Sequence, residues 1–176
     1  MKFEIEHTFS GISLAAYERL YFDEPFNSAL CEKVELDREL LKLEENGDAL
    51  HREVKVSPRG REIPKPIAKF MGVSRIEYVE KIDYTFGSGR GTWLSVSSFM
   101  TDKIDSGGTI EMLDTGAGVK RIVAGEIKVK VFGLGKTIES FIVEDVKRSY
   151  QDAAAFTRDW IAAGNVVTIT LFYNFK

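Results

Sequence analysis

The chain has 176 residues and carries 24 Lys and Arg against 27 Asp and Glu, which gives a formal net charge of -3. A chain of this length most naturally forms one domain that buries about 70% of the surface of its unfolded form. Because a surface for nucleic acid or for anionic membranes generally needs an excess of basic residues, the charge balance argues against both kinds of partner.

The N-terminal stretch MKFEIEHTFSG alternates charged and apolar residues, so we expect neither a signal peptide nor an integral membrane segment. The single cysteine, Cys31, has no partner for an internal disulfide, which fits a reducing cytoplasm. The two histidines, this cysteine and the scattered acids show no metal-ligand spacing. We therefore expect a cytoplasmic protein with no metal and no other cofactor.

Three elements are expected at the start of the chain. Residues 2–10 alternate between apolar and polar side chains, which is the period of a half-buried strand. Ser13 is a suitable N-cap for a helix over 14–22, where apolar residues recur at helical spacing. Asp23 then caps a second short helix, 24–30, whose proline suits a first turn.

Six further strands are expected, because alternating segments are separated by short turns rich in glycine. These segments cover 34–44, 49–57, 74–86, 92–101, 109–115 and 119–132. Neighbours joined by so few residues must pair antiparallel. The longer connection, 58–73, contains proline and glycine and is expected to be a rim loop with one helical turn at 67–71.

A long amphipathic helix is expected over 136–162, where apolar residues recur at steps of three and four. The preceding sequence GLGKT, residues 133–137, matches half of a phosphate-binding loop. The full motif needs a further glycine five residues before its second one, and Lys130 occupies that position. We therefore expect a tight glycine turn between a strand and a helix, and no bound nucleotide.

The expected order is one strand, two short helices, six antiparallel strands and one long helix. An antiparallel sheet with its helices on one face is an α+β layer architecture. A sheet of this length tends to curl. Curling about the long helix would leave an apolar space between the two layers.

Two segments, YERLYFDEPF at 17–26 and GLGKTIESFI at 133–142, carry a resemblance to a known family. With the element order, they resemble the START-like, pollen-allergen-like helix-grip (SRPBCC) superfamily in its uncharacterised bacterial branch, and are somewhat similar to sterol-transfer VASt domains. The similarity covers residues 2–162. It implies a seven-stranded sheet around a hydrophobic cavity. It also implies a small hydrophobic ligand, because most members bind or carry lipids, sterols, quinones or polyketide-like molecules, while a minority are cyclases or hydrolases.

The family pattern normally ends near residue 163, so we expect a helix-grip domain over 1–163 and a C-terminal extension over 164–176. Alternate residues of the extension are apolar, and residues 167–173 carry no charge. This pattern predicts an eighth strand. It would pair with its own sheet or with a second copy in a homodimer, and an artefact of the reading frame is a third explanation.

Aromatic residues and methionines near the loops and along the long helix are the candidates for lining the cavity, because they suit an adaptable apolar site. They are Phe22, Phe26, Phe70, Met71, Tyr78, Tyr84, Trp93, Phe99, Met100, Met112, Phe141, Tyr150 and Trp160. Core packing alone would also explain each of them. Glu80 and Arg121 lie on otherwise apolar strand faces, so they either orient a ligand head group inside the cavity or reach the wet rim.

Three functions stay open on this evidence. The favoured one is a carrier or sensor of a lipid-like molecule, for which transient membrane contact stays open. A cyclase or hydrolase would use a cavity acid such as Glu80, and an interaction module would fill the cavity with its own side chains. His7 and His51 fit packing better than a catalytic pair, and no G-x-S-x-G motif supplies a nucleophile.

Overall fold

The computed structural model describes residues 1–59, 62–72 and 75–165. Its helices are α1 (Leu14–Phe22), α2 (Glu24–Lys33), α3 (Lys65–Met71) and α4 (Gly135–Ala162). Its strands are β1 (Lys2–Ser10), β2 (Leu36–Asn46), β3 (Ala49–Pro58), β4 (Tyr78–Thr85), β5 (Arg90–Ser97), β6 (Ile104–Asp114) and β7 (Gly118–Val129). The predicted extra strand, 166–176, lies outside the described residues.

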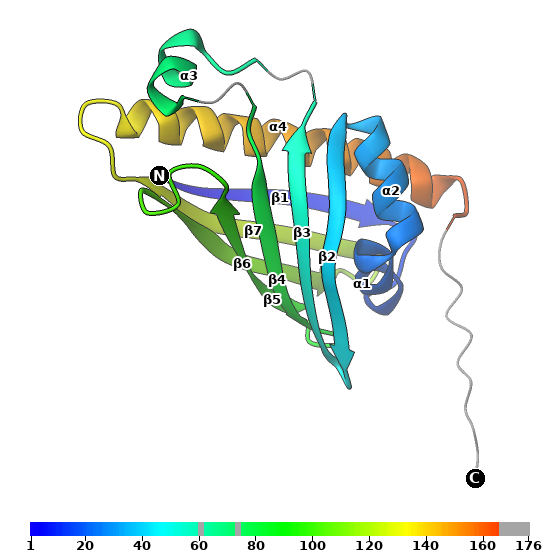
Figure 1. Ribbon diagram of the computed structural model, residues 1–176. Coiled ribbons are helices and arrows are strands. Elements are labelled where there is room, and N and C mark those ends of the chain that lie inside the picture. Colours follow the sequence, from blue (N-terminus) through cyan, green and yellow to red (C-terminus); the bar gives the residue numbers. More distant parts are fainter. Residues whose placement is uncertain (60–61, 73–74, 166–176) are drawn as a thin grey trace.

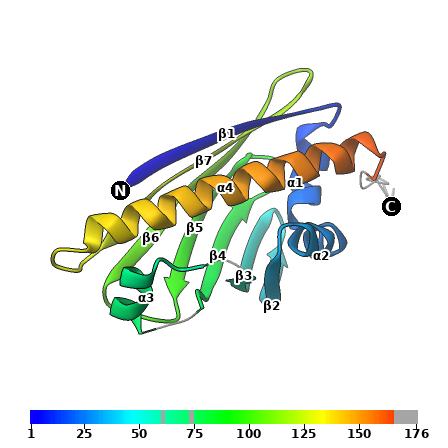
Figure 2. The same ribbon diagram turned by 90° about the horizontal axis from the view of Figure 1, so that it is seen from above.

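The strands form one antiparallel sheet in the order β1-β7-β6-β5-β4-β3-β2. The sheet is curved, and α4 crosses its concave side (Figure 1). Seen from above, α3 lies beside the first half of α4, whereas α1 and α2 lie beside its second half (Figure 2). The chain is thus an α+β fold in which a seven-stranded antiparallel sheet curls around a long C-terminal helix, as predicted.

Both predicted N-caps are present at the start of the short helices. The hydroxyl of Ser13 accepts a hydrogen bond from the backbone N–H of Ala16 at 3.3 Å, and the Asp23 carboxylate accepts one from that of Phe26 at 2.9 Å. The Asn27 side chain donates to two backbone carbonyls at the α1–α2 junction, at 3.0 and 2.7 Å. These bonds cap both helices and fix the junction between them.

The glycine-rich segment at 133–137 forms the predicted turn between β7 and α4. Gly133 has a φ of 76°, which a residue with a side chain rarely adopts. A Cβ on Gly135 would lie 2.5 Å from the carbonyl oxygen of Val129. Both glycines are therefore explained by the tight approach of the helix start to the end of β7.

The sequence prediction was wrong about the start of β6. Residues 105–108 were expected to be a turn, but β6 begins at Ile104 and contains them. The connection instead follows Ser97, where β5 ends. A Cβ on Gly108 would lie 1.9 Å from the carbonyl oxygen of Ala124 and 2.8 Å from Nε1 of Trp93. A side chain here would therefore collide with the backbone of β7 and with the aromatic ring on β5.

The hydrophobic core has two parts. One packs α1, α2 and the second half of α4 against the sheet around Phe9, and the other packs β1, α3 and the first half of α4 around Ile127. Trp93 and Tyr150 are only partly buried and contact both parts. These two residues therefore lie where the two parts of the core meet under α4.

Candidate functional site

Two cavities lie between the concave side of the sheet and the helices. The first, which we call the apolar chamber, has a volume of about 140 Å³ and lies under the first half of α4. The second, the polar chamber, has a volume of about 150 Å³ and lies under α1, α2 and the second half of α4. They share the lining residues Leu36, Tyr78, Glu80, Ser149 and Tyr150, which border both cavities and which we call the neck.

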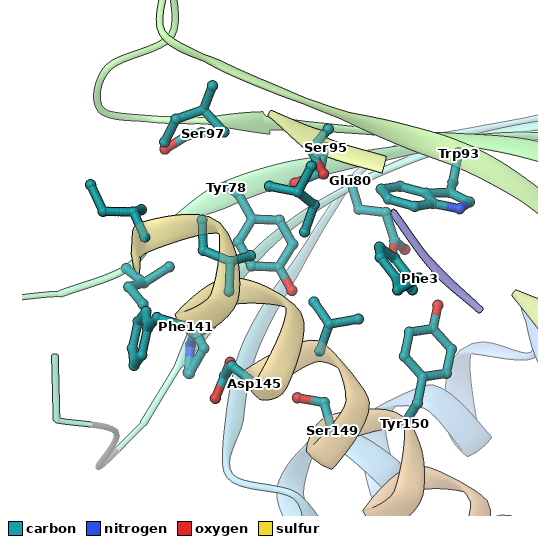
Figure 3. A pocket seen from close by; sticks show the side chains of 18 of the residues that line it. Phe3, Tyr78, Glu80, Trp93, Ser95, Ser97, Phe141, Asp145, Ser149 and Tyr150 are labelled. Atoms are coloured by element: carbon teal, nitrogen blue, oxygen red, sulfur yellow. The ribbon is translucent and has the colours of Figure 1, made fainter. Parts of the chain in front are cut away.

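The apolar chamber has a helical wall and a sheet wall (Figure 3). The helical wall carries Phe141, Ile142 and Val146, and the sheet wall carries Phe3 and Trp93, among others. Aromatic and aliphatic carbon atoms thus make up most of its surface, with a few polar groups between them. This composition suits a ligand that has a large apolar surface.

Trp93 forms the floor of the apolar chamber. Its indole N–H donates to the carbonyl oxygen of Ala124 at 3.2 Å, which holds the ring across the sheet. The ring of Phe3 lies 6.0 Å from it, centroid to centroid. The indole is therefore fixed in one orientation, with its one polar atom satisfied by the backbone and its remaining surface available to packing partners.

Strand β5 reverses the usual distribution of polar and apolar residues. Ser95 and Ser97 face the apolar chamber, as does Ser106 of β6. The residues between them on β5 point to the outside, where Leu94 is 49% and Val96 is 36% exposed. A strand that only packed a core would place its aliphatic side chains inside, so the inward serines are polar groups placed at a cavity wall.

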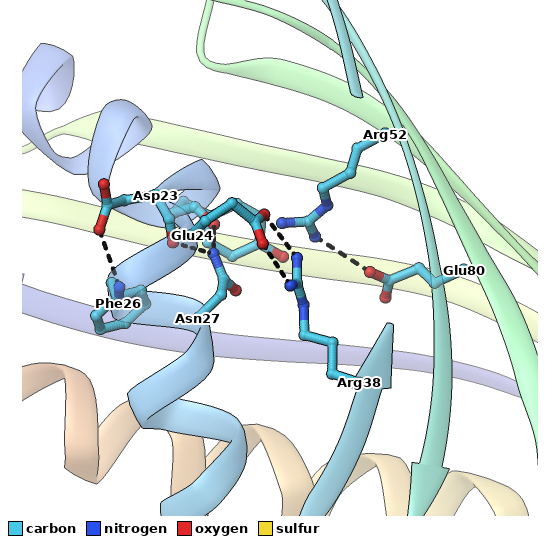
Figure 4. Close-up of polar contacts among 8 residues, drawn as sticks. Asp23, Glu24, Phe26, Asn27, Arg38, Arg52 and Glu80 are labelled. Carbon is cyan, nitrogen blue, oxygen red and sulfur yellow. Dashed lines mark hydrogen bonds and ion pairs between the residues drawn. The ribbon is translucent and has the colours of Figure 1, made fainter. Parts of the chain in front are cut away.

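The polar chamber is lined by three arginines from the sheet, of which two have carboxylate partners (Figure 4). Arg38 makes a bidentate pair with Glu24 of α2, at 2.6 and 2.8 Å. Arg52 donates from one Nη to Glu80 at 3.2 Å, while its Nε and its other Nη have no hydrogen-bond partner among the described residues. Arg52 is only 5% exposed, so these donors are buried.

The third arginine, Arg121 of β7, is 3% exposed. One Nη donates to the Tyr17 hydroxyl and the other to Nδ1 of His7, each at 3.3 Å, and Nε has no partner in the described part of the chain. The guanidinium carbon lies 5.1 Å from the ring centroid of Tyr150 and 5.2 Å from that of Phe9. Within the described residues, no carboxylate lies within 4.0 Å of this guanidinium.

The protonation states around Arg121 follow from burial. Desolvation raises the pKa of Tyr17, Tyr21 and Tyr150, so their hydroxyls keep their protons at neutral pH. Burial disfavours the charged form of Arg121, but an arginine side chain keeps its proton in proteins, and the Tyr17 hydroxyl accepts a hydrogen bond from its charged form. The guanidinium is therefore a buried cation among neutral groups.

His7 is neutral beside this cation. Burial lowers its pKa, and the positive charges of Arg121 and Arg158 act in the same direction, against the hydrogen bond with Gln151. A guanidinium can only donate, so Nδ1 of His7 is the acceptor from Arg121. The proton is consequently on Nε2, from which it is donated to Oε1 of Gln151 at 3.2 Å.

Of the residues predicted to line a cavity, Tyr78, Glu80, Trp93, Phe99, Phe141 and Tyr150 line the apolar chamber, and Phe26 and Arg121 line the polar chamber. The linings do not include Phe22, Tyr84, Met112 or Trp160, which pack in or against the core around Phe9. Met100 is half-buried in the turn after β5. The side chains of Phe70 and Met71 lie outside the part of the structure that is described.

Sequence reasoning missed several lining residues. Tyr17 recurs at helical spacing in the predicted helix over 14–22 and Arg52 lies in the predicted strand over 49–57, but neither was named as a lining residue. The serines of β5 had a visible signal, because they alternate with Leu94 and Val96 and share a face with Trp93. If Trp93 is taken to mark the inward face of β5, the serines face inward and the aliphatic residues face outward. This arrangement predicts a cavity wall rather than a packed core.

The two histidines do not share a site. His7 faces the interior, whereas His51 hydrogen-bonds to Asp83 at 2.7 Å and to Glu53 at 3.1 Å at a more exposed position. Among the described residues, no group of three or more His, Cys, Asp or Glu is placed to hold a metal ion. Within the same residues, no helix is long and apolar enough to span a membrane.

A family model described as "Protein of unknown function (DUF2505)" matches residues 4–161. The matched range includes every described helix and strand, except for the first two residues of β1 and the last residue of α4. No curated protein matches the chain.

Solved structures with the same fold include the protein TTHA0849 of Thermus thermophilus, at 12% identity and a TM-score of 0.63, covering 93% of this chain and 99% of that one. The Zhui aromatase/cyclase from Streptomyces sp. R1128 is 10% identical with a TM-score of 0.61, covering 91% and 95%. Ara h 8.0201 is 12% identical with a TM-score of 0.60, covering 93% and 98%. At such identities the likeness establishes the helix-grip fold alone.

Proposed function

The chain belongs to the DUF2505 family of proteins of unknown function, and we propose that it binds a small hydrophobic ligand in the apolar chamber. The observation that carries the proposal is the reversed pattern of β5, where Ser95 and Ser97 face the chamber while Leu94 and Val96 are exposed. A chain that needed only a solid core would gain stability from the opposite arrangement, because apolar burial contributes about 25 cal/mol per Å².

The ligand class we propose is lipid, sterol, quinone or polyketide-like, and the role is that of a carrier or sensor. The fold is shared with Ara h 8.0201 and with the Zhui aromatase/cyclase. The likeness of the sequence to sterol-transfer VASt domains makes sterols one class to include in a screen. Such a protein would work in the cytoplasm and contact membranes only transiently.

A cyclase or hydrolase is the second candidate, because Glu80 faces both chambers and the Zhui aromatase/cyclase shares the fold. The Glu80 carboxylate is already engaged by Arg52 at 3.2 Å, and among the described residues no second acid or base that could complete a catalytic pair is identified beside it. We therefore place binding before catalysis. A Glu80→Gln variant that keeps ligand binding but loses turnover would instead favour the cyclase or hydrolase.

Native mass spectrometry of freshly purified protein, followed by organic extraction, tests the proposed function. A chain of about ten methylenes buried in the chamber would contribute roughly 8 kcal/mol, and association costs several kcal/mol. Micromolar to sub-millimolar affinity is therefore expected, which permits some ligand to remain bound through purification. A protein that carries no extractable molecule and binds none of a broad panel of lipids, sterols and quinones would favour the interaction module.

A further inference from the structure

We propose that the polar chamber binds the anionic head of the ligand, so that the ligand is an amphipathic carboxylic acid with Arg121 as its counter-ion. This inference rests on the proposed function, because it places the apolar body of the same molecule in the apolar chamber. Its starting point is the charge balance of the polar chamber. Arg38 is neutralised by Glu24 and Arg52 by Glu80, which leaves the charge of Arg121 uncompensated within the described residues.

An unpaired buried charge is costly, and its neutral neighbours only reduce that cost. Tyr17 and His7 each accept one hydrogen bond from Arg121, and Tyr150 and Phe9 present ring faces to it. None of these groups carries a negative charge at neutral pH. A bound anion would supply the missing negative charge.

The charged residues that line the polar chamber are mostly cations, because Arg38, Arg52 and Arg121 all border it. Nε of Arg121, and Nε and one Nη of Arg52, are buried and have no hydrogen-bond partner in the described part of the chain. Among the residues described as lining this chamber, the only carboxylate is that of Glu80, and it is engaged by Arg52. One uncompensated positive charge favours an anion over a cation, and it matches a monoanion such as a carboxylate.

The neck between the chambers determines the shape of the ligand. Tyr150 and Ser149 from α4 and Tyr78 and Glu80 from β4 border both spaces. A ligand with its head group beside Arg121 and its body above Trp93 would have to pass between these residues. The molecule that fits is one carboxylate joined to an aliphatic or aromatic body.

Isothermal titration of the unmodified protein with dodecanoic acid, dodecan-1-ol and methyl dodecanoate at pH 8 tests the inference. The three probes share one chain and differ in the charge of the head. We expect the acid to bind at least tenfold more tightly than the alcohol and the ester. Equal affinities would overturn the anion site and leave the proposed function intact. No binding of any probe would overturn the inference, and the proposed function would then be decided by the broader panel of sterols and quinones.

An Arg121→Gln variant then tests whether Arg121 causes the preference for dodecanoic acid over the uncharged probes. It should lower the affinity for the acid at least tenfold and leave that for the alcohol unchanged. Lys120→Gln, an equal loss of charge at the neighbouring outward position of β7, should change neither. An unaltered acid preference in a folded Arg121→Gln variant would overturn the role of Arg121. If that variant proves unstable, Arg121→Lys should keep the acid preference, and its loss there would count against recognition by charge.

Discussion

The indole of Trp93 occupies the space that a side chain at Gly125 would need. A Cβ added to Gly125 would lie 2.3 Å from Cζ2 of Trp93. The two residues belong to β5 and β7, and Gly108 of β6 pairs with both. Because Gly108 and Gly125 have no side chains, the Trp93 ring can pack directly against the backbone of β6 and β7. The ring in turn lines the bottom of the apolar chamber.

Gly125→Ala is expected to lower the free energy of unfolding by about 1–3 kcal/mol, because the new methyl group would collide with the indole ring of Trp93. Tryptophan emission should shift as the ring moves. Chemical denaturation of Gly125→Ala in the natural background and in a Trp93→Leu background measures the coupling. The cost should be smaller where the ring has been removed, and an identical cost in both backgrounds would show that the indole is not the obstacle.

Glu18 joins α1 to the turn between β4 and β5. Its carboxylate is 2% exposed and accepts hydrogen bonds from the N–H groups of Gly87 and Gly89, at 3.0 to 3.1 Å, and from the Tyr84 hydroxyl at 2.9 Å. Glu18→Gln replaces one accepting oxygen by a donor that faces these donors.

We expect the Glu18→Gln substitution to reduce stability by about 1–3 kcal/mol, since buried donors lose their acceptor. Glu45→Gln, at an exposed residue paired with Arg19, is the matched control and should cost no more than about 1 kcal/mol. Thermal unfolding followed by circular dichroism compares the two variants. Equal shifts in Tm would mean that the buried carboxylate does not fix the turn.

The order of elements was predictable because glycine turns and alternating segments are local signals. The start of β6 was not, since Gly107 and Gly108 are the usual signal of a turn, and their actual role depends on Trp93 of another strand. Arg52 and Tyr17 were missed for a similar reason. Which face of β3 is concave, and which side of α1 meets Arg121, are decided by long-range packing rather than by local pattern.

Stability should depend on pH through His7. Its pKa in the folded protein lies below the unfolded value of about 6.5, so the unfolded chain binds more protons below that pH. Stability is therefore full above about pH 6.5 and falls as the pH drops toward the folded pKa. His51 has the opposite sign, because hydrogen bonds to Asp83 and Glu53 raise its pKa.

A His51→Asn background removes that opposing contribution and isolates His7. In it, the free energy of unfolding between pH 7 and pH 5 should decrease, and adding His7→Gln should flatten the profile. The groups that face His7 are Arg121, Arg158 and Gln151, and none of them titrates in this interval. If the free energy of unfolding still falls as steeply between pH 7 and pH 5 after His7→Gln, the pH dependence comes from another group.

The C-terminal extension is proposed to pair as a strand, separately from the domain over 1–163. Its residues 167–173 are uncharged, and an unpaired strand of this kind promotes aggregation. A chain that ends after Gly164 should therefore differ in oligomeric state or in solubility by size-exclusion chromatography with light scattering. Backbone amides at 167–173 that exchange as fast as those of a free peptide would speak against pairing.

The most direct test of the ligand-binding account fills the apolar chamber from one strand. In a Trp160→Phe background, Trp93 is the sole tryptophan and reports on the chamber floor. Dodecan-1-ol, a sterol and a quinone are titrated against this protein and against its Ser95→Phe and Val96→Phe derivatives, which add the same ring to the inner and outer faces of β5. The account predicts saturable binding of at least one probe that Ser95→Phe weakens tenfold or more and Val96→Phe leaves unchanged. No saturable change in Trp93 emission with any probe, or equal effects of the two substitutions, would contradict it.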